Sequence, residues 1–345
     1  MPLQNTPQRP PFEVRILNVQ TDNRNVNEPQ SDKTRFGLLL PASRQTKYDD
    51  LTPPNPDDIE YLENELGVGR LGRYPFPKWL WIAGRPVPPR ALHYQLVLGR
   101  EIFIVEQMDF HLVWTSGRMF LKPVPRYLLE PSFWTEYLAC QRDCACTQGA
   151  NDLCGRQKLR KCALGFLFSY AALIRYESDF LLAQARYLIP SEARWEGWRQ
   201  LVVELQTEHI YDKIDERYIY GELRLSRLNK IQYLHASVAF RGYMPTWRRY
   251  GDFFYDNFTW LASATVYIAI VLTAMQVGLA TDALMKNRAF QAASFGFTVF
   301  SIVGPLAAIT FILCVFTYIF LWNWIATMKY RRRRLPHVYA KTQVD

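Results

Sequence analysis

Five of the six cysteines lie close together in the chain and could bind a metal ion. Their spacing is C-x3-C-x-C-x7-C-x7-C, and the four candidate ligands are Cys140, Cys144, Cys146 and Cys154. Four thiolates close in sequence can hold a tetrahedral zinc ion, although this spacing is not that of a standard zinc knuckle. The favoured interpretation is a metal-free polar loop that joins two helices, and a zinc site and a redox-sensitive loop are the alternatives.

A glycine-rich pattern, Gly67-Val68-Gly69-Arg70-Leu71-Gly72, matches the GxGxxG dinucleotide fingerprint. That fingerprint binds a pyrophosphate only between a strand and the N-terminus of a helix. Here a predicted helix precedes the glycines and a proline-containing segment follows them. We therefore interpret the pattern as a helix C-cap and a turn.

Motifs typical of hydrolases are missing from the sequence. The chain has five histidines, with neither a GxSxG elbow nor an HExxH pattern. His111 falls within a strand pattern, and we interpret it as a hydrogen-bonded structural residue. We expect no enzymatic activity, and an enzyme with an unrecognised site is kept as an alternative.

The elements around these residues predict an α+β domain, mostly helical with a small antiparallel sheet. Asp57-Asp58 predict the start of a helix that ends at Gly67. HLVWT and RMFLK flank Ser116-Gly117 and predict a tight hairpin, with EIFIVE as a third strand. The apolar stretch from Ala163 to Ile174 is too short to cross a bilayer and predicts a core helix, continuing through LLAQARYLI. A further helix has one apolar face, formed by Trp195, Trp198, Val202 and Leu205.

Two long uncharged stretches near the C-terminus predict transmembrane helices. The first runs from Asn257 to Thr281, and the second lies between Arg288 and Lys329. About 20 apolar residues are enough to cross a bilayer. Gly304-Pro305 predicts a kink in the second helix. Small residues at four-residue spacing predict a close approach of the two helices: Ala274 and Gly278, Gly304 and Ala308.

Basic residues directly after the second stretch predict the topology. They are Lys329, Arg331, Arg332, Arg333 and Arg334. Because positive flanks favour the cytosolic side, we expect an integral membrane protein with both termini in the cytosol. The net charge of +9 is not accompanied by a nucleic-acid-binding motif, so we expect no nucleic-acid partner.

Aromatic residues predict where the chain meets the lipid headgroups. Near the end of the second stretch these are Trp322 and Trp324. Before the first stretch, one side of a helical wheel carries Trp247, Tyr250, Phe254 and Phe258. We expect an amphipathic helix lying at the membrane interface, and the alternative is that this stripe packs against the soluble domain.

These patterns predict how the chain is organised. A disordered or loosely packed arm over residues 1–50 comes before a cytosolic α+β domain over 51–244 and an amphipathic interfacial helix over 245–257. Transmembrane helices over 258–281 and 291–328 are joined by a short loop over 282–290, and a basic cytosolic tail covers 329–345.

Several strings carry a family resemblance: WIAGRPVPPR, LVLGREIF, HLVWTSGRMFLKPVPRYLLEPSFW, YGELRLSRLNK, RGYM and ASATVYIAIVLTAMQVGLAT. The chain is identified by them as a member of an uncharacterised fungal family of membrane proteins with two C-terminal transmembrane helices. The resemblance runs from about Leu38 to Arg334 and implies an architecture but no activity. The sequence lacks the Asp, His and Ser motifs of the subtilisin-like proteases, a label that such sequences sometimes carry.

The architecture also resembles the two-helix magnesium channels, which have a large cytosolic domain before two C-terminal spans. Their Gly-Met-Asn signature is missing, and Met275-Gln276-Val277-Gly278-Leu279 stands in its place.

The favoured function is a membrane-tethered interaction or scaffold module whose partners are the bilayer and a protein or further copies of the chain. An oligomeric ion channel is the alternative.

Overall fold

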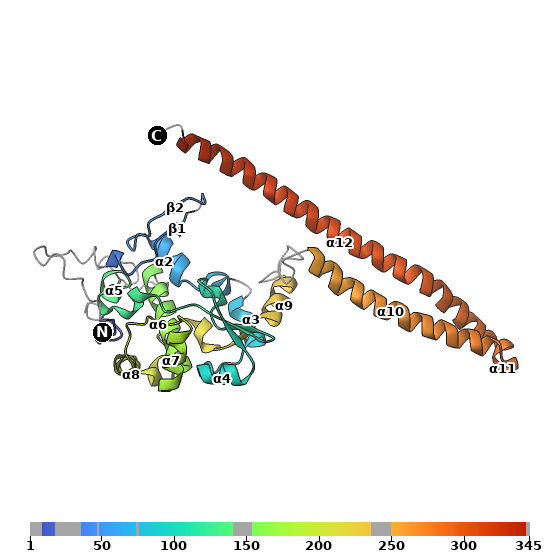
Figure 1. Ribbon diagram of the computed structural model, residues 1–345, viewed down its shortest axis with the longest axis horizontal. Helices are drawn as coiled ribbons and strands as arrows, with labels where there is room; N and C mark the ends of the chain where they lie inside the picture. The colour runs from blue at the N-terminus through green and yellow to red at the C-terminus, as the bar shows by residue number, and fades with distance from the viewer. Residues whose placement is uncertain are drawn as a thin grey trace, which may run out of the picture. The chain divides into compact units, whose positions relative to one another are not determined.

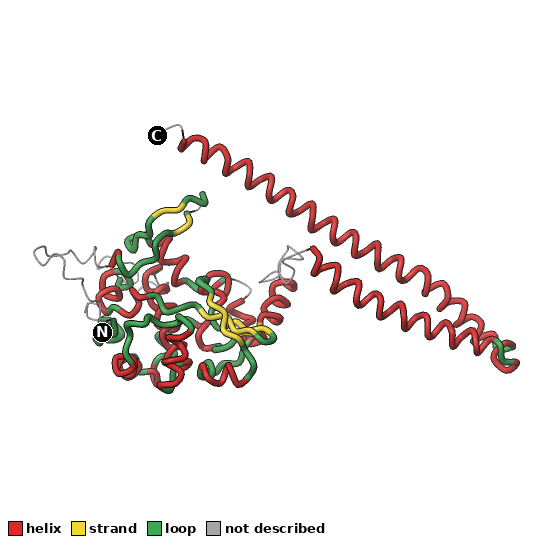
Figure 2. Tube along the Cα trace, viewed as in Figure 1, coloured by secondary structure: helices red, strands yellow, loops and turns green. Residues whose placement is uncertain are grey.

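The computed structural model describes residues 9–17, 36–46, 48–73, 76–140, 154–235 and 250–342. The chain divides into two compact units, Met1–Met244 and Pro245–Asp345. Figure 1 identifies the elements of each unit, and Figure 2 shows that helices predominate over strands. The structure thus confirms a mostly helical chain with small sheets.

The first unit combines short helices with two sheets. Its helices are α2 (Ile59–Leu66), α3 (Phe76–Ala83), α4 (Leu92–Val97), α5 (Pro131–Glu136), α6 (Gly155–Leu173), α7 (Glu177–Ala185), α8 (Trp195–Glu204) and α9 (Leu225–His235). Its strands are β1 (Arg44–Gln45), β2 (Leu51–Thr52), β3 (Glu101–Ile104), β4 (Val113–Thr115), β5 (Arg118–Leu121) and β6 (Leu223–Arg224).

Helix α2 begins and ends where the sequence predicts. The Asp58 carboxylate accepts a hydrogen bond from the Glu60 N–H at 3.0 Å, which satisfies one of the free donors of the first turn. At the other end, Gly67 is the C-cap and donates its N–H to the Glu63 carbonyl. The capping residues therefore fix both ends of the helix.

The larger sheet corrects the expected antiparallel pairing. Its strand order is β3-β5-β4-β6, and only the β4–β5 pair is antiparallel. That pair is the predicted hairpin, with Gly117 at φ +70° in its turn. Strand β3 pairs with β5 in parallel, as β6 does with β4. The β3–β5 pair is parallel because the chain passes through a 3₁₀ turn at Met108–Phe110 into β4 and then returns in β5, and β6 joins the other edge from a distant part of the chain.

Helix α6 forms the centre of the core, as its apolar sequence predicts. Phe166, Tyr170 and Leu173 are fully buried. The predicted continuation into LLAQARYLI is wrong in one respect, because Ile174 ends α6 in a non-helical conformation. A new helix, α7, starts at Glu177 with a capping box that uses the Asp179 side chain.

Part of the N-terminal arm belongs to the folded core, unlike the loosely packed arm that the composition predicts. Phe12, Ile16 and Leu17 are buried, and Leu17 forms an antiparallel bridge with Ala193. The Phe12 ring meets Trp134 edge-on, with 6.2 Å between the ring centroids. Apolar side chains between the polar residues of this stretch supply the contacts that hold it in place.

Two glycines in helices test the packing of the core. A Cβ at Gly165 would overlap the ring of Tyr218, whereas a Cβ at Gly197 would find its nearest neighbour, Ile16 Cα, at 3.7 Å. We expect Gly165→Ala to destabilise the protein by about 1–3 kcal/mol through overpacking. Gly197→Ala should raise stability by up to about 1 kcal/mol through helix propensity. Thermal unfolding of the two purified variants measures the difference, and equal effects would contradict the described packing.

The second unit consists of α10 (Tyr250–Leu279), the short α11 (Asp282–Met285) and α12 (Arg288–Thr342). Helices α10 and α12 pack side by side and are joined at one end by α11 (Figure 1). By length and composition, two segments among the described residues could cross a membrane: Trp260–Leu279, with mean hydropathy 1.7, and Arg288–Pro336, with mean hydropathy 2.5. Only 6% of each apolar window is buried, whereas the apolar residues of α6 lie inside the core.

Gly278 of α10 and Gly304 of α12 each face an aromatic ring. A Cβ at Gly278 would overlap the ring of Phe290, which lies near the start of α12. Gly304 instead faces the ring of Phe300, in its own helix. Helix α12 is continuous through Pro305, and it includes Pro336 and the basic residues before it.

Candidate functional site

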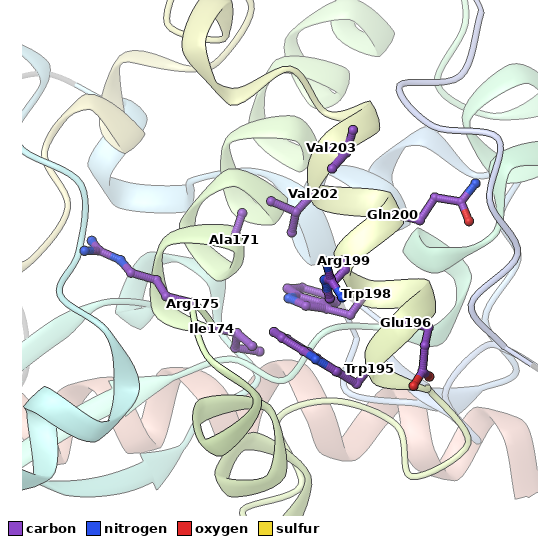
Figure 3. Close-up of a pocket in the computed structure, with 10 residues that line it drawn as sticks. All are labelled: Ala171, Ile174, Arg175, Trp195, Glu196, Trp198, Arg199, Gln200, Val202 and Val203. Atoms are coloured by element: carbon purple, nitrogen blue, oxygen red, sulfur yellow. The ribbon is translucent and has the colours of Figure 1, made fainter.

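A groove with a volume of about 570 Å³ lies between the C-terminal end of α6 and one side of α8. Its walls are Ala171, Ile174 and Arg175 on one side and, on the other, residues of α8 from Trp195 to Val203. Figure 3 shows the two indole rings between the helices, directed toward Ile174 and Ala171. Its size is within the range of small-molecule and peptide-anchor pockets.

The groove is built on the apolar face that the sequence predicts for α8. Trp198 is fully buried, Trp195 is half-buried, and both rings pack near Phe180 of α7, with centroid distances of 5.6 Å for Trp195 and 6.5 Å for Trp198. Spacings of three and four residues place Trp195, Trp198 and Val202 on one side of the helix. Two rigid aromatic rings thus form an apolar floor.

The polar groups around the groove are mainly hydrogen-bond donors. The Trp198 indole N–H is buried and has no partner among the described residues. The Arg175 guanidinium donates to the carbonyls of Ala172 and Pro89. Arg199 is exposed and forms no ion pair with a described residue, while Glu196 and Gln200 point away from the groove centre (Figure 3). An occupant with acceptor groups would complement these donors.

His111 is a structural residue, as the sequence predicts. Its Nδ1 accepts the Lys122 backbone N–H at 3.2 Å, so the proton of the neutral ring is on Nε2. Nε2 lies 2.8 Å from Ser169 Oγ, and that hydroxyl donates to the Phe166 carbonyl at 2.6 Å. Burial, Arg217 and Lys122 hold the pKa of His111 well below its usual value. The ring N–H therefore donates a hydrogen bond to the Ser169 hydroxyl, and the ring does not act as its base.

His93 is a half-exposed imidazole held by a buried carboxylate, and sequence reasoning did not single it out. Its Nδ1 lies 2.8 Å from Asp179 Oδ1, which also accepts the His93 backbone N–H. Asp179 Oδ2 accepts the backbone N–H groups of Arg175 and Tyr176. Asp179 belongs to α7 and His93 to α4, so their hydrogen bonds fix α4 against the start of α7.

The glycine-rich segment has the role expected for it. Gly67 caps α2, and Gly69–Gly72 form a 3₁₀ turn, with Gly69 at φ +54°. A shallow cavity of about 390 Å³ lies beside this turn, but Arg70 pairs with Asp109 across it at 2.9 Å. A helix precedes the glycines, so the strand–turn–helix arrangement of a dinucleotide site is not formed.

Two of the four candidate zinc ligands come together in the structure. The sulfur atoms of Cys140 and Cys154 lie 3.2 Å apart; Cys140 follows α5, and Cys154 is the N-cap of α6. Cys144 and Cys146 lie outside the described residues. Two thiolates on one tetrahedral zinc, each at about 2.3 Å from the metal, would lie about 3.8 Å apart, so a small adjustment would allow both to bind.

The zinc hypothesis predicts a metal content that depends on these cysteines. If the four thiolates bind zinc, purified protein contains about one zinc ion per chain, and Cys154→Ser lowers that content and the thermal stability. Cys314→Ser, which changes a cysteine of α12, serves as the matched control. Elemental analysis measures the zinc, and metal-free protein with unchanged stability after chelation would rule out a structural site.

The predicted membrane residues occur on the two long helices. Trp322 and Trp324 are exposed on α12, as are Lys329, Arg331, Arg332 and Arg333, while Arg334 is half-buried. Trp247 lies outside the described residues, as do the side chains of Tyr250, Phe254 and Phe258. The backbone at these last three positions forms the first turns of α10, which runs without a break into the apolar segment.

A helix-rich domain with a small mixed sheet, followed by two long apolar helices, defines the class of architecture. Residues 58–305 match a family described as a family of unknown function (DUF6601), and the chain belongs to this family. The match runs from the N-cap of α2 into α12, so it covers elements of both units. It confirms the resemblance to an uncharacterised family. Neither a curated protein nor a solved structure matches the chain.

Proposed function

We propose that the chain is an integral membrane protein whose helical domain binds an acidic, apolar segment of a partner protein in the groove between α6 and α8. The observation that supports the binding role is the pair of tryptophans on α8, which forms an apolar floor beside the exposed guanidinium of Arg199. Aromatic and arginine side chains are the residue types that most often dominate the energy of protein interfaces.

The membrane attachment is supported by the exposure of the two long helices. Trp260–Leu279 and Arg288–Pro336 are apolar, yet their side chains are directed mostly outward. In water such surfaces would leave large apolar areas unburied, and in a bilayer they would face lipid. Both helices are long enough for about 30 Å of hydrocarbon, since each residue adds about 1.5 Å.

The proposed orientation places both termini in the cytosol. The C-terminal flank of the second segment carries Lys329 and four arginines, whereas the connection around α11 carries only Asp282, Lys286 and Arg288. This asymmetry favours a hairpin whose turn lies on the far side of the membrane. The helical domain would then face cytosolic partners.

The chemistry of the partner follows from the free groups of the groove. The indole floor favours an aliphatic or aromatic anchor. Arg199 is exposed and can pair with a carboxylate. A segment with an apolar residue next to Asp or Glu satisfies both requirements.

Site-specific photo-crosslinking in native membranes tests the groove. A photoreactive residue at Val203, which is 77% exposed and lines the groove, should yield a discrete adduct. The matched control is Tyr187, which is 79% exposed and lies outside the groove. We expect the Val203 adduct to disappear in Arg199→Glu and in Trp195→Ala, and to persist in Trp81→Ala.

The pattern of these adducts decides the proposal. Loss in Arg199→Glu with rescue by a partner segment of reversed charge identifies acidic recognition. The same adducts from positions 203 and 187, or an adduct that Arg199→Glu leaves unchanged, would show that the groove is not the docking site. Circular dichroism of each variant confirms that the domain is folded.

A further inference from the structure

A second cavity, of about 470 Å³, lies near the opposite end of α6 from the groove. Its walls come from the N-terminal residues 9–11, the first half of α6, and the stretch from the end of α8 to Lys213. The N-terminal stretch is held there because Glu204 Oε2 accepts the backbone N–H groups of Glu13 and Val14, at 2.6 and 3.1 Å. The cavity therefore brings together three distant parts of the chain.

Basic side chains dominate this cavity. Its lining contains four cations, Arg9, Arg160, Lys161 and Lys213, against two carboxylates. One carboxylate, Glu204, is occupied by the two backbone N–H groups and by the Gln200 side chain at 3.0 Å. Arg9, Lys161 and Lys213 form no ion pair with a described residue. The cavity thus holds more positive than negative charge.

Arg160 carries its charge in a partly desolvated place. Its guanidinium donates to the carbonyls of Arg9 and Trp134 and lies over the Trp134 ring, 5.7 Å from the centroid. Its partners are neutral, and burial lowers the pKa of this guanidinium from its usual value. Removing a cation from water without a counter-charge is costly, and a bound anion would offset that cost.

We propose that this cavity is a binding site for a phosphate-bearing anion, contacted by Arg160, Lys161 and Lys213. Guanidinium and ammonium groups around one cavity suit a ligand with several negative oxygens, because each can form a charge-assisted hydrogen bond. The volume accommodates a small phosphorylated molecule or a phosphorylated lipid headgroup. This site goes beyond the proposed partner groove and does not depend on it.

Binding to the purified full-length protein in neutral detergent tests the proposal. The probes are pyrophosphate and a water-soluble, short-chain phosphorylated inositol lipid, each titrated calorimetrically. Lys161→Gln with Lys213→Gln should weaken binding at least about tenfold, since two charge-assisted contacts are lost. Neither lysine side chain has a described partner, so folding should be unaffected. Lys158→Gln, an exposed lysine of the same helix outside the cavity, is the matched control.

The two probes distinguish the sources of the phosphate. Equal affinity for both indicates a soluble phosphorylated molecule, and at least about tenfold tighter binding of the lipid indicates a headgroup; either result supports the site if the double variant weakens it. Absence of binding by both probes, or binding that the double variant and Lys158→Gln affect equally, would overturn the proposal. A folded Arg160→Gln variant should also lose affinity.

Discussion

Replacing Glu222 by alanine is expected to destabilise the first unit by about 3–5 kcal/mol, the cost of leaving a buried ion partner unpaired. Glu222 Oε2 accepts from Arg100 at 2.7 Å and from Arg90 at 2.5 Å, and its Oε1 accepts from Gln95 at 2.8 Å. Arg100 is only 8% exposed and stacks on Trp114, 4.1 Å from the ring centroid. Without Glu222, its positive charge would have no carboxylate partner among the described residues.

The matched control is an ion pair on the surface. Glu192 pairs with Arg126 at 2.8 Å, but both side chains are well exposed. Glu192→Ala should therefore change stability by no more than about 1 kcal/mol. Chemical denaturation of the two variants measures the difference, and a similar small loss for both would contradict a buried role for Glu222.

The same carboxylate predicts a dependence of stability on pH. Burial raises the pKa of Glu222, but the hydrogen bonds from Arg90, Arg100 and Gln95 outweigh it and hold the pKa at about 2, against a usual value of 4.5. Because the folded pKa is the lower one, the stabilisation is present above pH 4.5 and is lost as the pH falls toward 2. The gap between wild type and Glu222→Ala should narrow by about 3 kcal/mol across this window.

A charge at the centre of the apolar segment of α10 is expected to obstruct membrane insertion strongly. Ile270 lies at the middle of Trp260–Leu279, and its side chain is 62% exposed. Arginine at the centre of a transmembrane helix raises the apparent insertion free energy by about 2.5–3.5 kcal/mol. Ile270→Arg should therefore reduce the inserted fraction of the segment several-fold in microsomes.

A matched substitution separates lipid contact from loss of helix structure. Val277 is equally exposed, at 64%, but lies close to the end of the apolar segment. An arginine there can extend to the headgroups, so Val277→Arg should cost much less. Equal behaviour of Ile270→Arg and Val277→Arg would indicate a helix in water rather than in a bilayer.

Local patterns predict the elements that depend on neighbours in sequence. The ends of α2 follow from Asp58 and Gly67, and the hairpin follows from Ser116-Gly117 between two apolar runs. The long apolar segments of α10 and α12 are visible as uncharged stretches. In each of these cases, the residues that determine the structure lie within a few positions of one another.

Contacts between distant residues are not predictable in this way. The parallel pairing of β6 with β4 joins Leu223 to Val113, and no local pattern specifies that partner. Glu222 and Arg100 form their ion pair across a similar separation. The sequence predicts only one wall of the groove, the apolar face of α8. The other wall comes from α6, and no local pattern places α6 beside α8.

Protease digestion of sealed vesicles with the cytosolic face outward, followed by alkaline extraction, tests whether α10 and α12 cross the membrane as a hairpin. If α10 and α12 form a hairpin across the bilayer, protease removes the N-terminal domain and the basic C-terminal end, and a fragment that contains both apolar segments stays in the membrane after extraction. Protection of the N-terminal domain from protease would contradict the orientation. Release of the intact chain by alkali would contradict membrane integration itself.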